Sequence, residues 1–155
     1  MAERKVTDSK EIATILEQCQ ILFLSFNNDP APYVVPLFFG HEPGRLYAHS
    51  ARVGTKIELM LRDPYVGFSA VAAAEIIEGR MPCNYTARTQ SVAGTGAARL
   101  VTNEAEILHG LNLIMQHYAA GRTAEGFSYN PASLGRTAVI AIDIHAMTAK
   151  RIGPE

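Results

Sequence analysis

The 155-residue sequence has no tryptophan, only two cysteines and no excess of charge of either sign. Its 14 lysine and arginine residues are balanced by 15 aspartate and glutamate residues, so the total charge indicates no basic surface for nucleic acid. Cys19 and Cys83 form no C-x-x-C or zinc-ribbon pattern. No apolar run approaches the roughly 20 residues that span a bilayer. We therefore expect no nucleic-acid partner, no disulfide framework and no membrane span.

The first eleven residues are dominated by polar and charged side chains, and nothing there resembles a secretory signal. We expect a cytoplasmic protein with reduced thiols. Hydrophobic residues make up 48% of the chain and charged residues 19%, which is typical of an ordinary globular protein. A chain of this length suits one domain, taken here as residues 1–155.

Three segments have apolar residues at helical spacing. The first is predicted over residues 9–18, where Asp8 and the glutamate three positions later have the form of a capping box. The second helix is predicted to open near Arg52. The third follows Asn103 and stops at Gly121. The apolar face of the second helix is predicted to contain Val53, Ile57 and Leu61.

Six short extended segments lie between these helices, and most are connected by turn signals that predict hairpins. They are residues 21–26, 31–40, 45–50, 65–71, 91–101 and 137–144. The strand over 31–40 is apolar on both faces, so both faces should be covered. Pro36 interrupts it and cannot donate to a ladder, so we expect an edge, a bulge or a ligand at that position. The pattern indicates a mainly β protein with peripheral α-helices, a small barrel or sandwich.

Two glycine patterns are poor matches to nucleotide-binding motifs. Gly94-Thr95-Gly96 lacks the third glycine and a following helix, so it is not a dinucleotide fingerprint. Its small residues instead predict close approach of another backbone. Gly54-Thr55-Lys56 lacks the order of a phosphate-binding P-loop. Residues 72–90 contain glycine and proline and are predicted to be an irregular excursion.

The histidines offer only weak signals. His109 and His117 lie eight residues apart on the third helix, but no third ligand accompanies them, so no metal site is predicted. His49 ends a strand beside a polar junction, where it is either a hydrogen-bonded structural residue or a weak catalytic candidate.

The junction between the third strand and the second helix gathers polar and cationic residues. A helix N-terminus presents unpaired N–H groups and a partial positive charge of about half an electron. Ser50 can add a hydroxyl there, and Arg52 and Lys56 add full charges. These residues outline a phosphate site. In the alternative interpretation, Ser50 caps the helix and both cations are solvated.

Four segments in this order resemble a known family: PYVVPLFFG, LYAHSARVGTKIELM, DPYVGFSAV and QSVAGTGAARLV. They are similar to the pyridoxamine-phosphate-oxidase-like FMN-binding split barrels, and most similar to the nitroimidazole-resistance (Nim-type) branch. The resemblance extends from about Lys10 to Lys150 and rests on the combination of H-S-A-x-x-G-x-K with S-V-x-G-x-G. It implies a six-stranded antiparallel split β-barrel of Greek-key type. It also implies a homodimer with FMN sites at the subunit interface.

The resemblance further implies which residues contact FMN. The flavin ring would lie against the second and third strands, its phosphate would be held after the third strand, and a later segment would approach the cofactor. The implied residues are Val35, Pro36, Leu37, His49 and Ser50 for the ring, Arg52, Gly54 and Lys56 for the phosphate, and Ser91 and Val92 in the later segment.

The sequence lacks the arginine-rich C-terminal segment with which pyridoxamine-phosphate oxidases hold their substrate, so that reaction is not expected. The resemblance implies an FMN-dependent oxidoreductase acting on a small substrate, with nitroaromatic compounds as one class. The alternative is a flavin- or haem-binding protein for storage or sensing, without turnover. Residues 72–90 either cover the site or pack on the partner subunit.

Overall fold

The structure is a computed structural model that describes residues 3–119 and 128–154. Its strands are β1 (Glu3–Val6), β2 (Leu22–Phe26), β3 (Tyr33–Leu37), β4 (Phe39–Glu42), β5 (Arg45–Ala51), β6 (Tyr65–Val71), β7 (Glu75–Ile77), β8 (Thr86–Leu100) and β9 (Thr137–Ile152). Its helices are α1 (Ser9–Gln18), α2 (Thr55–Arg62), α3 (Glu104–Tyr118) and α4 (Pro131–Arg136), with one 3-10 turn, Pro82–Asn84.

The strands form one antiparallel sheet in the order β3-β2-β6-β8-β9-β5-β4, with β1 added to β9 and β7 added to β8. The two end strands of this order, β3 and β4, are separated in the chain by Phe38 alone. The sheet must therefore roll until its two ends meet at that residue. Within the described residues no ladder joins β3 to β4 or β5, so the barrel stays split. The predicted mainly β, antiparallel split barrel is confirmed.

The strand number differs from the prediction, because nine strands are present among the described residues rather than six. Residues 31–40 form two strands that break at Phe38. β8 begins at Thr86 and β9 runs to Ile152, both beyond the predicted bounds. The two extensions pair with each other at Thr89–Ile152 and Gln90–Arg151, and most of their other residues pair with β7, with β1 or with residues 91–95 of β8. Ladder hydrogen bonds need no apolar pattern, so these extensions carry no signal in the residue pattern.

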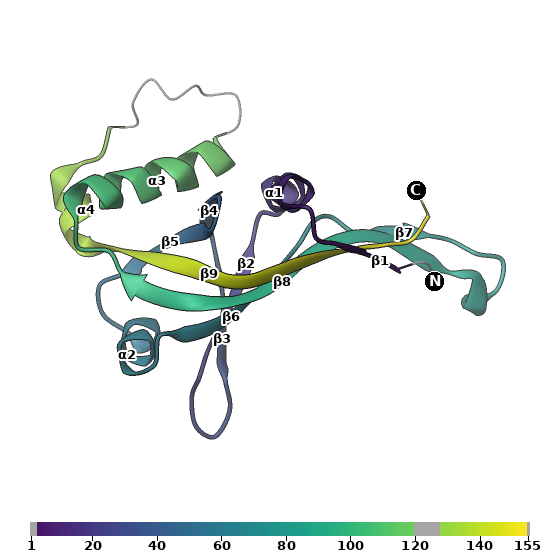
Figure 1. Ribbon diagram of the computed structural model, residues 1–155, viewed down its shortest axis with the longest axis horizontal. Coiled ribbons are helices and arrows are strands. Elements are labelled where there is room, and N and C mark those ends of the chain that lie inside the picture. The colour runs from purple at the N-terminus through teal and green to yellow at the C-terminus, as the bar shows by residue number, and fades with distance from the viewer. Residues whose placement is uncertain (1–2, 120–127, 155) are drawn as a thin grey trace.

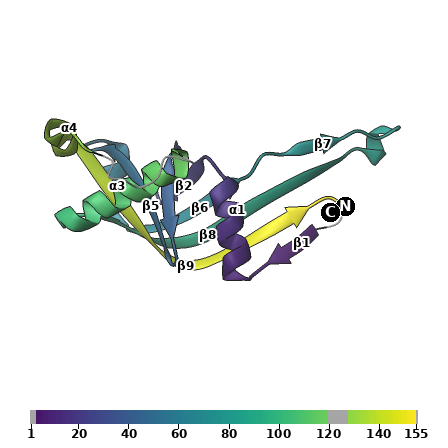
Figure 2. The same ribbon diagram turned by 90° about the horizontal axis from the view of Figure 1, so that it is seen from above.

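Figures 1 and 2 show that the extended ends of β8 and β9 project from the barrel as an arm, together with β1 and β7. Residues 72–90 are therefore only partly irregular, because β7 pairs with β8 inside them. The arm leaves large apolar side chains exposed, namely Ile76, Met81 and Tyr85.

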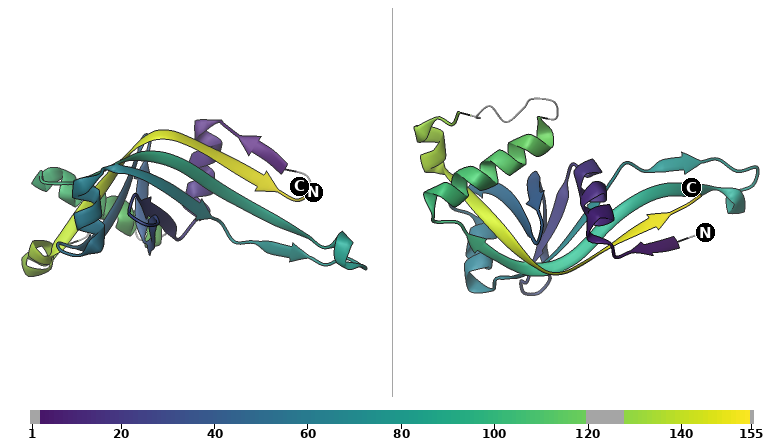
Figure 3. Two further views of the ribbon diagram at one scale, coloured as in Figure 1. Left: turned by 90° about the horizontal axis from the view of Figure 1, so that it is seen from below. Right: turned by 45° about the horizontal axis from the view of Figure 1, so that its top comes forward.

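Alternate residues of the strands fill the barrel. The inward side chains of β2, for example, are Leu22, Leu24 and Phe26, all fully buried. A second apolar cluster lies outside the barrel, where α3 packs on β4, β5 and β9 (Figure 3). Tyr47 is fully buried in that cluster.

Glycines permit the closest contacts between these layers. A methyl group at Gly40 of β4 would lie 2.5 Å from the Ile114 nitrogen in α3. Methyl groups at Gly94 and Gly96 would collide with the backbone oxygens of Ala146 and Asp143 in β9. The prediction that Gly94-Thr95-Gly96 admits another backbone is confirmed.

Side-chain caps fix the starts of α1 and α3 as predicted. Asp8 accepts hydrogen bonds from the backbone of Lys10 and Glu11, and Asn103 accepts one from Glu106. The predicted stop of α3 at Gly121 lies outside the described residues. Among the helices that the structure describes, none has the length and apolar character to cross a membrane.

The prediction for α2 was wrong in its start and in part of its apolar face. The helix begins at Thr55 rather than near Arg52. Val53 is 83% exposed and Leu61 69% exposed. The buried residues are Ile57, Leu59 and Met60. Val53 precedes the helix and so lies outside its apolar face, whereas Leu61 is in the last turn and stays exposed although it lies four residues after the buried Ile57.

Candidate functional site

The junction of β5 and α2 is open at the helix N-terminus. Gly54 occupies the N-cap with φ of +133°, a conformation that favours glycine, and nothing lies within 4 Å of the place its side chain would take. The first helical hydrogen bond runs from the Glu58 nitrogen to the Gly54 oxygen. The N–H groups of the first turn, at residues 55–57, therefore have no acceptor inside the helix.

Ser50 does not cap this helix. Its hydroxyl donates to the Ala51 carbonyl oxygen at 2.8 Å instead. Among the residues that the structure describes, no side chain caps α2. The alternative interpretation of Ser50 as the helix cap is wrong, and the first-turn N–H groups remain available to another acceptor.

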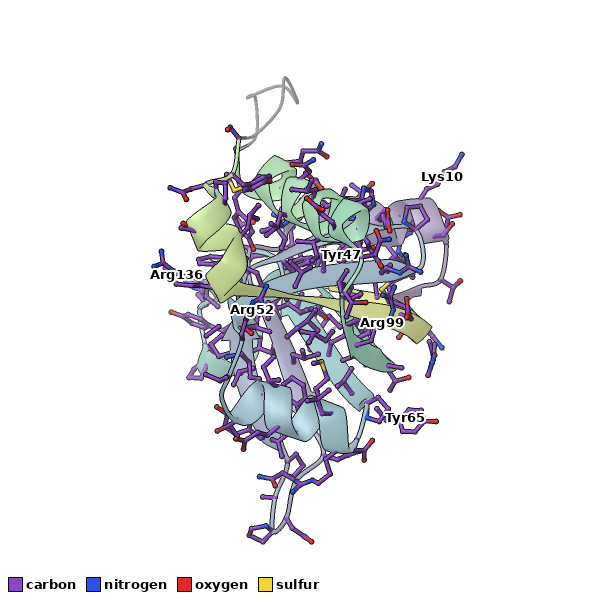
Figure 4. The ribbon with its side chains drawn as sticks, turned by 90° about the vertical axis from the view of Figure 1, so that its left-hand side faces the viewer. Lys10, Tyr47, Arg52, Tyr65, Arg99 and Arg136 are labelled. Atoms are coloured by element: carbon purple, nitrogen blue, oxygen red, sulfur yellow. The ribbon has the colours of Figure 1, made fainter. Side chains whose placement is uncertain are left out.

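Two cations lie beside these N–H groups. Arg52 is exposed and Lys56 is half-buried, and within the described ranges neither takes part in an ion pair. Arg52 lines a cavity of about 430 Å³ with Thr102 and Thr137, between the end of β8 and the start of β9 (Figure 4). Lys56 is not among the residues lining that cavity.

His49 and Ser50 point to opposite faces of β5, because successive strand residues alternate. His49 lines a second cavity, of about 240 Å³, with α3 residues such as Leu111 and with Tyr129 and Thr137. Thr137 also lines the Arg52 cavity, so the two cavities are neighbours. Partial desolvation lowers the pKa of His49, which favours the neutral form of its imidazole.

β3 places its predicted contact residues on both faces. Val35 and Leu37 pack on the barrel core. Pro36 points outward on this end strand, as expected for a residue that cannot donate to a second ladder. The outward face is not covered as predicted, because Val34 and Phe38 are each 55% exposed. The molecule leaves an apolar edge in solvent.

The later segment lies far from the junction in the same chain. Ser91 pairs with Val71 and Lys150, near the base of the arm. The Arg52 cavity reaches Leu100, nine residues further along β8 and roughly 30 Å away at about 3.3 Å per residue. The Val92 side chain is fully buried, and its backbone is paired on both sides, with Ala70 of β6 and Ala149 of β9. One copy of the chain does not bring all predicted site residues together.

A shallow groove on the outward face of β2, β6 and β8 carried no sequence signal. Ser25, Gly67 and Thr95 lie in register across these strands and line a space of about 430 Å³ with Tyr65 and His145. Phe23 and Val71, on the same face, are 45% and 48% exposed. Small side chains between exposed apolar ones leave this face flat. The alternation within one strand can indicate which of its residues point outward. Only the register between strands places Ser25, Gly67 and Thr95 side by side.

A polar network beside the second core also escaped the sequence analysis. Arg99 donates to both oxygens of Glu106, at 2.7 and 3.1 Å, and to Asp143 at 2.9 Å. Arg45 donates to the other Asp143 oxygen at 2.7 Å, and Tyr47 donates to Glu106 at 3.0 Å (Figure 4). These residues come from β5, β8, β9 and α3, so only the sheet register assembles them.

Charge pairing in this network shifts the acidic groups. The hydrogen bonds from Arg99 hold the pKa of Glu106 below its ordinary value. Burial alone would raise the pKa of Asp143, but Arg99 and Arg45 lower it. Both carboxylates stay ionised, and the network fixes the start of α3 on the sheet.

This architecture is that of a split β-barrel with helices on the outside. A family model described as pyridoxamine 5'-phosphate oxidase matches residues 8–151. The chain therefore belongs to that family. No match is found among curated protein sequences.

Solved structures agree with this assignment. A candidate 5-nitroimidazole antibiotic resistance protein from Bacteroides thetaiotaomicron is 28% identical, with a TM-score of 0.82 over 99% of this chain and 90% of that one. An FAD and heme binding protein from Mycobacterium smegmatis is 18% identical, with a TM-score of 0.83 over 97% and 74%. The flavocytochrome Anf3 from Azotobacter vinelandii is 18% identical, with a TM-score of 0.80 over 97% and 70%. The last two show a common fold.

Proposed function

We propose that this chain binds FMN and acts as a flavoprotein oxidoreductase on a small substrate, with nitroaromatic compounds as one class. The observation that carries the proposal is the uncapped N-terminus of α2. Free N–H groups, an unobstructed glycine and two cations without an ion pair in the described part of the chain, Arg52 and Lys56, lie within five residues. A dianionic phosphate ester satisfies all of these groups at once.

The flavin ring is proposed to lie against the strands nearest this phosphate site. β3 is an end strand, so backbone groups on its outer side have no ladder partner within the described residues. Pro36 leaves a position on that edge without an N–H, which suits contact with a flat ring better than another strand. The neutral imidazole of His49 can donate one hydrogen bond in the neighbouring cavity.

We also propose a homodimer in which each site uses two copies of the chain. The apolar outward face and the exposed side chains of the arm need a cover, and a second copy supplies one. Ser91 and Val92 lie too far from the phosphate site to serve it within one chain. A partner arm reaching across would bring those residues to the site of the other copy.

The bound flavin supplies the redox chemistry, accepting electrons from one substrate and passing them to another. The chain then needs no nucleophile or base of its own. Its residues hold the phosphate, support the ring and leave one side of the ring open. Family membership supports a flavin in this role, as do two of the structural relatives, an FAD and heme binding protein and a flavocytochrome.

Purified protein tests the cofactor directly. We expect a flavin absorbance spectrum and release, on denaturation, of one FMN per chain, identified by mass. Release of FAD would correct the cofactor, and a haem Soret band would favour the haem-binding alternative. Protein that is colourless and does not take up added FMN would overturn the proposal.

Turnover separates an enzyme from a storage protein. We expect NADH or NADPH to reduce the bound flavin and a nitroaromatic compound to reoxidise it faster than the buffer does. The same assay with free FMN at equal concentration is the control. Equal rates of reoxidation with the protein and with free FMN would indicate a flavin carrier rather than an oxidoreductase.

A further inference from the structure

We propose that Glu17, His41 and His117 bind one divalent transition-metal ion, with Zn²⁺ as the best match to the ligand set. The ligand atoms of these residues all lie within 4.8 Å of one another. They come from the last turn of α1, from β4 and from the last turn of α3. The site is separate from the proposed flavin site.

The distances approach those of a metal centre. Glu17 Oε2 lies 2.6 Å from His41 Nε2 and 3.5 Å from His117 Nδ1. Metal bonds of about 2.0–2.1 Å place tetrahedral ligand atoms roughly 3.4 Å apart. Glu17 is 58% exposed, so its side chain can adjust by the small amount required.

His117 provides an independent indication of a ligand. Its side chain is only 3% exposed, and among the described residues no group hydrogen-bonds to its Nδ1 atom. The other ring nitrogen, Nε2, lies 2.5 Å from the Cys19 carbonyl oxygen. A carbonyl oxygen only accepts, so Nε2 carries a proton. In the neutral ring Nδ1 is then a lone pair facing the Glu17 carboxylate.

Without a metal ion this arrangement is costly. A neutral ring places two acceptors 3.5 Å apart, and a charged ring buries a cation almost completely. A metal ion between Nδ1 and Glu17 removes both problems. Histidine ligands commonly donate their second N–H to a carbonyl, as His117 does to Cys19.

The surroundings favour a cation. Glu17 and His117 are each the penultimate residue of their helix, so two helix C-termini with partial negative charge converge on the site. Two imidazoles and one carboxylate are the donor set of many zinc sites, with a water in the fourth position. The open side at Glu17 gives both the ion and that water access.

The sequence missed this site because its ligands are far apart in the chain. His117 was paired with His109, its neighbour on the helix, rather than with His41. The structure instead pairs His109 with Glu42 at 2.7 Å on the surface, with no third ligand among the described residues. His109 therefore provides a matched control.

Titration with Zn²⁺, and with Co²⁺ as a spectroscopic probe, tests the site in the full chain. We expect one Zn²⁺ per chain, a higher melting temperature with Zn²⁺, and visible Co²⁺ bands of a tetrahedral site. Glu17→Gln and His41→Ala should each weaken binding at least tenfold. His109→Ala should leave it unchanged. Circular dichroism checks that each variant is folded.

The outcomes are distinguishable. A wild-type chain that binds no Zn²⁺ at 100 μM, our chosen limit, contradicts the proposal. So does unchanged affinity in both Glu17→Gln and His41→Ala. An equal loss in His109→Ala would show adventitious binding to surface imidazoles and would also overturn it. None of these results depends on whether flavin binds.

Discussion

Lys56 is the residue on which the phosphate proposal can be tested with one change. Lys56→Ala removes a charge-assisted contact worth about 1.5–3 kcal/mol. FMN affinity should therefore fall roughly ten- to a hundredfold, measured by fluorescence quenching during titration of the apoprotein. Lys10→Ala, an exposed lysine of α1, is the control and should bind normally. Equal FMN affinities in the wild type, Lys56→Ala and Lys10→Ala would show that Lys56 does not contact the phosphate.

Arg99 is the centre of the polar network on the second core. Arg99→Gln breaks three hydrogen bonds to carboxylates, so the free energy of unfolding should fall by about 1.5–3 kcal/mol. Arg88→Gln is the matched control, because the Arg88–Glu75 pair is exposed and should contribute less than about 1 kcal/mol. Urea denaturation measures the free energy of unfolding of both variants. An equal, small loss in both would show that the Arg99 contacts contribute no more than an exposed ion pair.

The same network predicts how stability depends on pH. The pKa values of Glu106 and Asp143 are lowered on folding. Their contribution is therefore complete above the unfolded pKa of about 4 and is lost as the pH falls through the folded values. The urea concentration at the unfolding midpoint of the wild type should decrease as the pH falls below about 4. In Arg99→Gln the drop should be shallower, and an identical pH profile would contradict this assignment.

At the scale of elements, the contact between α3 and β4 depends on Gly40. Gly40→Ala places a methyl group 2.5 Å from the α3 backbone, so the helix must shift. We expect a loss of about 1–3 kcal/mol in the free energy of unfolding. In Gly135→Ala the added methyl meets nothing within 4 Å in α4, so stability should be unchanged or slightly higher. Thermal and urea unfolding measure both.

Gly40 also couples the second core to the Glu17, His41 and His117 cluster. The C-terminal half of α3 lines the His49 cavity and carries His117 in its last turn. A shift of α3 in Gly40→Ala should therefore weaken Zn²⁺ binding along with stability. Gly135→Ala again serves as the control.

At the scale of the whole molecule, the arm and the apolar outward face predict a dimer. Light scattering after size exclusion should give twice the chain mass of 16.8 kDa. Ile76→Asp puts a charge on an exposed apolar arm residue, 65% exposed in one chain, and should shift the population toward monomer. Ala132→Asp, on α4, is the matched surface control. A monomeric wild type that still holds a full complement of FMN would refute the shared site.

The sequence by itself determined the local features of this protein. Asp8 and Asn103 identify two helix starts, because a cap needs only its own next few residues. The apolar, β-prone runs of β2 and β6 identify two strands, because turn signals bound them locally. The β5–α2 junction was also visible, since its glycine and cations lie within five residues. Family resemblance added the split barrel.

Only the tertiary structure decided the rest, because those features depend on partners far away in the chain. The ends of β8 and β9 beyond the predicted bounds become strands because they pair with each other, with β7 and with β1. The Arg99 network and the Glu17, His41 and His117 cluster each join three or more elements. The spacing of residues within one segment cannot predict these contacts, because the packing of the rolled sheet and its helices brings the residues together.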